Sequence, residues 1–448
     1  MATPSPLSAA AQAAEDRPRL PIGATILVAA LAAPVALLTV EKPTHLLLAL
    51  AAAAVVVVSV ARVEIALLLL VAAAPLEDAV RLSSNPQLTV TKLAGALCFA
   101  SFALWALASG RRLSFDRTHA AVLLLLALAL VSSLQAEEFG AATATAVRYA
   151  SFVALYIVVS QFAGNHALQR RIAWVLSLAG GAAAMIALNE FLSGNTTQSR
   201  PPYGDPNDHA YMLATTLPLT LWLLGERRWR PVVLVLAAAM SASIALSFSR
   251  GALVGLAAAL VWHVLTERRG QMLLLGGVIV LAAGTTFLLV QANPEQVQTG
   301  LRAKQKVATA NVDTRVDAWR AATRLSLEHP ILGVGPGNFR FHYLEETGRP
   351  AGTSNIGVVH NAYLDVAAEL GLLGGILFLG YLAAVFARAT AARRAGRGPP
   401  GMASALRTAL VVAFVGALFL SEQYFAPFWL LGALATALWR EGAPDARE

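Results

Sequence analysis

Apolar stretches without charge follow one another along almost the whole chain. The segments 46–60 and 122–131, for example, contain no charged residue. Charged side chains make up 13% of the 448 residues, whereas soluble domains carry roughly 25%. Because a helix needs about 20 mostly apolar residues to cross a bilayer, the sequence predicts an all-α polytopic membrane protein.

The same pattern predicts 12–14 transmembrane helices. The number spans a range because several candidate segments are short or lie close together in the sequence. The candidate segments are 23–40, 44–61, 63–80, 92–109, 118–136, 144–163, 170–192, 209–225, 231–248, 250–266, 271–291, 362–387, 404–420 and 424–440.

Arginines indicate how these segments are oriented. If the N-terminus is cytoplasmic and the sides alternate, most arginines of the short loops fall on the cytoplasmic side, as the positive-inside rule requires. The net charge of +8 then reflects loop anchoring and not nucleic-acid binding, because no basic stripe alternates with aromatic residues. The predicted regions are a mobile cytoplasmic N-terminus 1–22, a transmembrane region 23–291, an outer loop 292–359, a second transmembrane region 360–440 and a cytoplasmic tail 441–448.

The outer loop 292–359 is the longest polar segment, and we expect short helices within it. Apolar residues recur at helical spacing over 313–328 with charges around them, which is typical of an amphipathic helix. Pro330 should end this helix. The glycines of 333–337 predict a tight turn, because glycine accepts backbone angles that other residues resist.

Four polar elements fall on the outer side of the membrane in this topology, and charge near a membrane core is costly enough to suggest a function. Each also has an ordinary explanation. Arg200 can be a simple loop arginine, Arg250 can extend toward lipid headgroups, and Arg315 can pair with a neighbouring aspartate. The four elements are 199–208, 247–251, 313–315 and 360–361.

His360 lies where the outer loop re-enters an apolar helix. A lone histidine is more often structural than catalytic, but its charge can change near neutral pH. Arginine has a planar guanidinium that suits phosphate oxygens and stays charged. Two or three arginines and a histidine on one face therefore predict a site for a phosphorylated lipid.

Two carboxylates follow the histidine at helical spacing. Asp365 and Glu369 are four residues apart on one helix face, within or near the membrane, where buried carboxylates need partners. They could orient His360 or an arginine, or they could stabilise helix packing, which is the alternative that we favour.

The sequence contains no clear motif for nucleotide binding, for a nucleophilic serine or for a metal site. It has no glycine-rich nucleotide loop and no nucleophile elbow, and no His/Cys cluster has metal-ligand spacing. Asp205 and Asp208 are a weak exception, because Pro206 between them indicates a turn. The single cysteine, Cys98, excludes a disulfide framework. We expect no cofactor and no metal.

The second half of the chain resembles the bacterial O-antigen ligases. These belong to a superfamily that also holds O-antigen polymerases and protein O-oligosaccharyltransferases. The resemblance rests on Ser-Arg-Gly at 249–251, Arg-x-x-x-Trp at 315–319, Gly-x-Gly-x-Gly-x-Phe at 333–339 and His-Asn…Glu-x-Gly at 360–371. The re-entry at His360 after one large outer loop is typical of the superfamily, but it does not single out ligases.

The resemblance implies a metal-independent, inverting glycosyltransferase with a GT-C-type membrane fold, whose active site faces the periplasm at the bacterial inner membrane. Such enzymes transfer a glycan from undecaprenyl diphosphate to lipid A–core oligosaccharide. His360 would then be the general base, and Arg250 and Arg315, with Arg200 as a weaker third, would hold the diphosphate. The residues expected to line or support the pocket are Tyr203, Asp205, Asn207, Asn361, Asp365 and Glu369.

Three alternatives stay open at this point. An O-antigen polymerase would use the same donor to extend a second lipid-linked chain. A protein O-oligosaccharyltransferase is a further relative, although many of these have a longer C-terminal part. A small-anion transporter belongs to another class, but transporters usually show internal repeats, and we find none.

Overall fold

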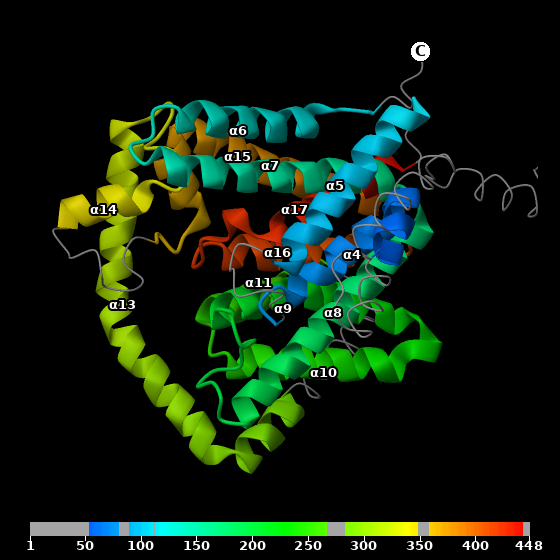
Figure 1. Cartoon of the computed structure of the whole chain (residues 1–448). Helices are drawn as coiled ribbons and strands as arrows, with labels where there is room; N and C mark the ends of the chain where they lie inside the picture. The colour runs from blue at the N-terminus through cyan, green and yellow to red at the C-terminus, as the bar shows by residue number, and fades with distance from the viewer. Residues whose placement is uncertain (1–52, 80–88, 111–112, 267–282, 348–357, 442–448) are drawn as a thin grey trace, which may run out of the picture. The chain divides into compact units, whose positions relative to one another are not determined.

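The computed structural model describes residues 53–79, 89–110, 113–266, 283–347 and 358–441. Within these ranges the chain forms helices joined by turns, and no strand occurs. The chain divides into two compact units: residues 1–73 and 82–114 form the first, and residues 74–81 and 115–448 form the second (Figure 1). The expected all-α fold is confirmed.

The first unit contains α5 (Val90–Ser109) and most of α4 (Val63–Leu76). Thr89 caps α5, because its side chain accepts a hydrogen bond from the Lys92 N–H. The Thr91 hydroxyl donates to the carbonyl of Ala73 at 3.1 Å, which joins the two helices.

The second unit contains the remaining helices with the candidate site. α6 and α7 pack on each other, α15 packs on α6, α13, α16 and α17, and α9 packs on α8, α10, α11 and α16. The helices are α6 (Arg117–Ser133), α7 (Phe139–Phe162), α8 (His166–Leu192), α9 (Pro206–Trp222), η1 (Leu223–Gly225), η2 (Arg227–Trp229), α10 (Arg230–Leu246), α11 (Arg250–Thr266), α13 (Pro294–Glu328), α14 (Phe339–Thr347), α15 (Ala362–Arg394), α16 (Met402–Gly416), η3 (Glu422–Tyr424) and α17 (Ala426–Arg440).

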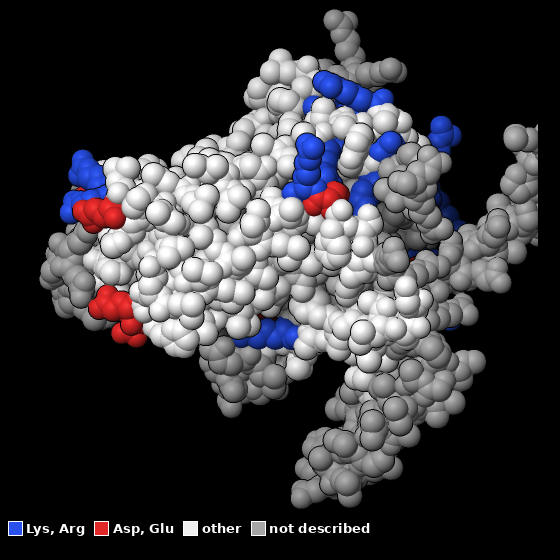
Figure 2. Space-filling model, turned by 90° about the horizontal axis from the view of Figure 1, so that it is seen from above, with Lys and Arg blue, Asp and Glu red and all other residues white. Residues whose placement is uncertain are grey.

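Length and composition make this a multi-pass membrane protein. Among the described residues, five helices are long and apolar enough to cross a bilayer, and further apolar helices are shorter. The five are Val90–Ser109, Phe139–Phe162, His166–Leu192, Arg227–Leu246 and Ala362–Arg394. Figure 2 shows the face over α6 and α7, where charged side chains gather at two opposite ends and the surface between them is nearly uncharged.

Four predicted spans fall wholly or partly outside the described residues, one of them, 63–80, by its last residue. The segment 23–40 lies outside them, 44–61 is described only from residue 53, and 271–291 only from residue 283. The predicted total of 12–14 spans therefore stays a prediction.

α13 is the main departure from the expected layout. It begins at Pro294 instead of residue 313 and extends over 35 residues to Glu328. Its first half is polar and lacks the apolar periodicity that marks 313–328, so periodicity could not reveal it. Pro294 occupies the first turn, where the missing N–H costs nothing. α13 runs across one end of α6, α7 and α15 (Figure 1).

The glycine turn 333–337 packs against a break in α15. Gly371 has φ +72°, so the predicted single span 362–387 is interrupted there. The break frees carbonyls that the turn then satisfies: Val334 N–H donates to Ala368 at 3.0 Å, and Gly335 N–H donates to Glu369 at 3.0 Å. A Cβ on Gly371 would lie 2.6 Å from the Pro330 carbonyl oxygen. The two glycine motifs are thus one interlocked structure.

Candidate active site

Trp319 fixes the histidine segment beneath α13. Its indole N–H donates to the carbonyl of Val359 at 3.0 Å. Arg315 is one helical turn before Trp319, so both side chains leave the same face of α13. The Arg-x-x-x-Trp spacing therefore places Arg315 close to His360, which directly follows Val359.

The backbone of His360 is held from two sides. His360 has φ +52°, a left-handed conformation that costs a non-glycine residue about 1–3 kcal/mol. Its N–H donates to Ser421 Oγ at 3.1 Å. Asn361 caps α15, since its Oδ1 accepts the N–H groups of Tyr363 and Leu364. These hydrogen bonds hold His360 in a left-handed backbone conformation that is otherwise unfavourable.

Arg250, like His360, lies in a segment with an unfavourable backbone conformation. Arg250 is the first residue of α11 and is exposed. Phe248, two residues earlier, has φ +53°. Among the described residues, Phe248 and His360 are the two non-glycine residues with positive φ. Backbone strain of this kind tends to gather at functional sites, and here it occurs at the two segments that carry Arg250 and His360.

His360 is neutral at physiological pH. The pKa of its imidazole is lowered to about 4, mainly by burial and also by the positive charge of Arg315, while the negative charge of Asp205 partly opposes this shift. A neutral imidazole can accept a proton. Which ring nitrogen carries its proton depends on the tautomer.

Arg315 joins the positive charges of the site. Burial lowers the pKa of its guanidinium, and the positive charge of Arg250 lowers it as well. The arginine nevertheless stays charged, because its ordinary pKa is far above neutral. Like charges held this close repel each other until an anion binds between them.

A lysine completes the cluster. Lys304 lies on α13 eleven residues before Arg315, which is close to three helical turns and therefore on the same face. Burial lowers the pKa of its ammonium, as do Arg315 and Arg250, whereas Asp205 raises it. We did not anticipate Lys304, because the start of α13 was not predicted; the eleven-residue spacing to Arg315 is the signal that would have found it.

The 199–208 segment contributes unevenly. Asp205 caps α9 by accepting the N–H groups of Asn207 and Asp208, and its charge acts on both His360 and Lys304. Asn207 Oδ1 accepts from Lys304 Nζ at 3.4 Å. Arg200 turns to its own loop, where it donates to the carbonyls of Pro202 and Gly204 at 3.4 and 3.0 Å.

Tyr203 is about half exposed, at 49%. Its backbone N–H donates to the carbonyl of Asp78 at 3.2 Å, which ties the loop to residues 74–81 of the same unit. The roles proposed for Arg200 and Tyr203 stay predictions.

The two carboxylates of α15 make hydrogen bonds to segments next to the site. Asp365 is buried and accepts from Gln423 Nε2 at 2.7 Å and from the Ser421 hydroxyl. Ser421 in turn accepts the His360 N–H, so Asp365 acts on the histidine backbone through one hydroxyl. Glu369 accepts from the Tyr424 hydroxyl and from the N–H groups at Gly337 and Phe339. Ser421 and Gln423 have no sequence signal that we recognised.

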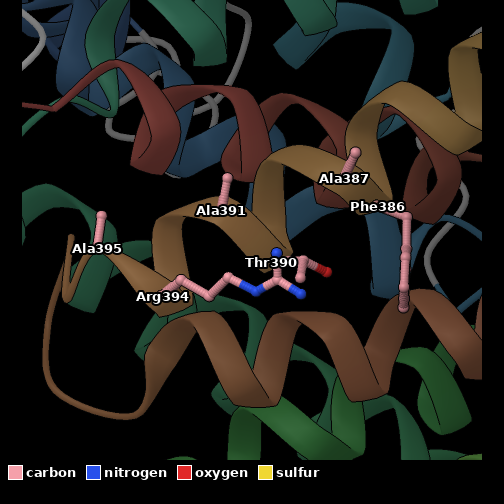
Figure 3. Close-up of a pocket in the computed structure, with 6 residues that line it drawn as sticks. All are labelled: Phe386, Ala387, Thr390, Ala391, Arg394 and Ala395. Carbon is pink, nitrogen blue, oxygen red and sulfur yellow. The ribbon is translucent and has the colours of Figure 1, made fainter.

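Two hollows lie outside this cluster. An apolar cavity of about 710 Å³ is bordered by α9, α10, α11 and α16, and Leu253, one turn after Arg250, lines one part of it. A shallower hollow of about 630 Å³ lies along the far end of α15, where Arg394 extends toward Thr390 (Figure 3). The second hollow holds no residue of the histidine cluster.

The arrangement suits one kind of chemistry. Three cations can bind an anion of two phosphates, and a neutral histidine beside them can take a proton. Fold and site together define a multi-pass helical membrane protein with a cationic, histidine-containing site.

Comparison with known families narrows this class. Residues 235–379 match the Wzy_C family model, described as O-antigen ligase, and the chain therefore carries a domain of this glycan-transferring family. The matched residues run from α10 into α15 and include Arg250, Lys304, Arg315 and His360. No curated protein matches the chain.

Proposed function

We propose that this protein transfers O-antigen polysaccharide from undecaprenyl diphosphate to lipid A–core oligosaccharide, in lipopolysaccharide biosynthesis. The observation that carries the proposal is the grouping of Arg250, Arg315 and His360, which come from α11, α13 and the start of α15. A family domain that covers all three supports a glycan-transferring reaction.

The arginines would bind the diphosphate of the donor. Guanidinium groups hold phosphate oxygens through paired, charge-assisted hydrogen bonds. The negative charge on the leaving diphosphate grows as the glycosidic bond breaks, so fixed positive charges stabilise the transition state more than the ground state. The apolar cavity beside α11 could accommodate part of a lipid tail attached to that diphosphate.

His360 would activate the acceptor. As the acceptor hydroxyl oxygen forms a bond to the anomeric carbon, the imidazole takes the hydroxyl proton. The bond between the anomeric carbon and the diphosphate oxygen breaks, and the diphosphate keeps the electron pair. A direct displacement of this kind inverts the anomeric configuration and needs no metal.

Complementation tests the proposal. The gene is expressed in a strain that lacks its O-antigen ligase but retains its polymerase, and the lipopolysaccharide is separated on a gel. We expect long-chain ladders attached to lipid A–core with the native chain and none with the His360→Ala variant at equal membrane abundance. Absence of ladders with the native chain would argue against ligation in that host.

Two other outcomes would identify a different function. If the native chain instead lengthens undecaprenyl-linked glycan in a strain without its polymerase, the acceptor is a second lipid-linked chain. If reconstituted protein moves a labelled small anion across vesicles but transfers no glycan, it is a transporter.

A further inference from the structure

α13 is fastened to the loop between α8 and α9 along one face. Gln296, Gly300 and Lys304 are spaced four residues apart, so they follow one another along one face of the helix. Gln296 Nε2 donates to the Thr196 carbonyl at 2.8 Å. A Cβ on Gly300 would lie 2.3 Å from the Thr197 carbonyl oxygen. Helix and loop are therefore in direct contact over two turns.

Lys304 is the last of these three residues, and its contacts differ from those of Gln296 and Gly300. Its Nζ donates to Gln198 Oε1 at 3.3 Å and to Asn207 Oδ1 at 3.4 Å. Both acceptors are neutral amides at long hydrogen-bond distances. A lysine that served only to fasten the loop would gain more from the carboxylate of Asp205, which lies close enough to act on its charge.

The surroundings of Lys304 are electrostatically unfavourable without an anion. It is half-buried, and the positive charges of Arg315 and Arg250 both act on it, while the negative charge of Asp205 opposes them. The positive charge of Arg250 likewise lowers the pKa of the Arg315 guanidinium. The positive charges of Lys304, Arg315 and Arg250 repel one another, so an incoming dianion would relieve repulsion among all three.

We propose that Lys304 is a third phosphate-binding residue of the site, which exchanges the amide oxygens of Gln198 and Asn207 for the diphosphate of the lipid-linked donor. This inference rests on the proposed function, because it takes the diphosphate as the ligand. The exchange also links donor binding to the loop that carries Arg200, since Lys304 leaves its contact with that loop when the diphosphate arrives.

Binding of undecaprenyl diphosphate to the purified full chain in lipid nanodiscs tests the role of Lys304. Loss of one charge-assisted hydrogen bond costs about 1.5–3 kcal/mol, so Lys304→Met should raise Kd roughly tenfold or more. Lys304→Arg keeps the charge and should stay within about threefold of the native value. Arg302→Met removes one charge from an exposed position of the same helix and should leave Kd unchanged.

Gln198→Ala separates phosphate binding from loop fastening. If Lys304 binds phosphate, removing its resting acceptor leaves Kd unchanged or lower. If Lys304 only fastens the loop, Gln198→Ala weakens binding as Lys304→Met does, and that result would overturn the inference. Native binding with an unchanged Kd for Lys304→Met would also overturn it. Failure of the native chain to bind undecaprenyl diphosphate would instead overturn the proposed donor.

Discussion

At the scale of residues, the surroundings of His360 decide what it can do. Burial and Arg315 hold its pKa at about 4, compared with 6.5 for an unperturbed histidine. The imidazole is therefore in the form that accepts a proton throughout the physiological range. The same positive charge that we propose for binding the donor's phosphates keeps the imidazole of His360 deprotonated.

The pH dependence of transfer follows from this shift. A lowered pKa keeps the base neutral to lower pH, so kcat/KM, which reports the free enzyme, should stay constant from about pH 8 to about pH 6. A bound diphosphate offsets the arginine charges and raises the histidine pKa, so the acid limb of kcat should lie at higher pH than that of kcat/KM. Steady-state kinetics across pH measures both limbs; an acid limb of kcat/KM near 6.5 would contradict the account.

The rate of transfer should depend on both the charge and the shape of the side chains at positions 250 and 315. Removing a donor that stabilises transition-state charge costs about 10²–10³-fold in rate, which we expect for Arg250→Ala and for Arg315→Ala. Lysine keeps the charge but loses the paired hydrogen bonds, so Arg315→Lys should recover only part of the activity. Arg302→Ala, at an exposed position of α13, is the matched control in the same kinetic assay. Equal losses in the control would point to a general charge effect.

At the scale of elements, the site depends on the contact between the glycine turn and the break in α15. The turn donates to carbonyls that the break leaves free, and α15 begins at the residues that follow His360. α13 enters the turn and carries Arg315 and Lys304. One interlocked segment thus sets the position of the base relative to its cations.

Closing the break should damage both stability and transfer. Gly371→Ala places a methyl group against the Pro330 carbonyl at a positive φ, which should cost roughly 1–3 kcal/mol. Gly380→Ala, also in α15, meets nothing within 4 Å and is the matched control. Thermal unfolding in detergent compares the two; equal melting temperatures for both variants would contradict the proposed contact.

Trp319 allows a more selective test of positioning. Trp319→Phe keeps an aromatic ring but removes the N–H that binds the Val359 carbonyl, at a cost of about 1 kcal/mol in stability. Because the lost bond fixes the segment that contains His360, kcat should fall about tenfold, as a misplaced base would predict. Trp229→Phe, at a partly exposed position, should leave kcat unchanged. An unchanged kcat for Trp319→Phe would show that this bond does not position the base.

The sequence predicted the elements best where one physical signal dominated. The start of the span 250–266 was predicted at Arg250, where α11 begins, because no charged residue follows Arg250 until Glu267. The start of α13 was missed because its first half has no apolar periodicity. The break at Gly371 was missed because it accommodates the chain at Pro330, and that contact joins residues distant in sequence.

The candidate site could be predicted only in part for a similar reason. Topology assigned Arg200, Arg250, Arg315 and His360 to one face, but a face is much larger than a site. The structure brings Arg315 into electrostatic range of both Arg250 and His360, whereas Arg200 turns to its own loop. Side-chain direction within a loop depends on tertiary contacts, which no local pattern records.

At the scale of the whole molecule, the proposed reaction requires the site to face the periplasm. The native chain has one cysteine, Cys98, which is buried. Arg340→Cys in α14 and Arg394→Cys at the end of α15 are both at exposed positions. We expect a membrane-impermeant maleimide to label residue 340 but not residue 394 in intact spheroplasts. The reverse labelling would place the site on the cytoplasmic side.

We propose that His360 takes the acceptor proton while cations hold a lipid diphosphate. The most direct measurement uses purified protein with undecaprenyl-diphosphate-linked glycan and lipid A–core, and follows formation of the glycosylated product. We predict transfer by the native chain and a loss of about 10²–10⁴-fold for His360→Ala, with donor binding retained. A folded His360→Ala variant that transfers glycan at the native rate would contradict the account.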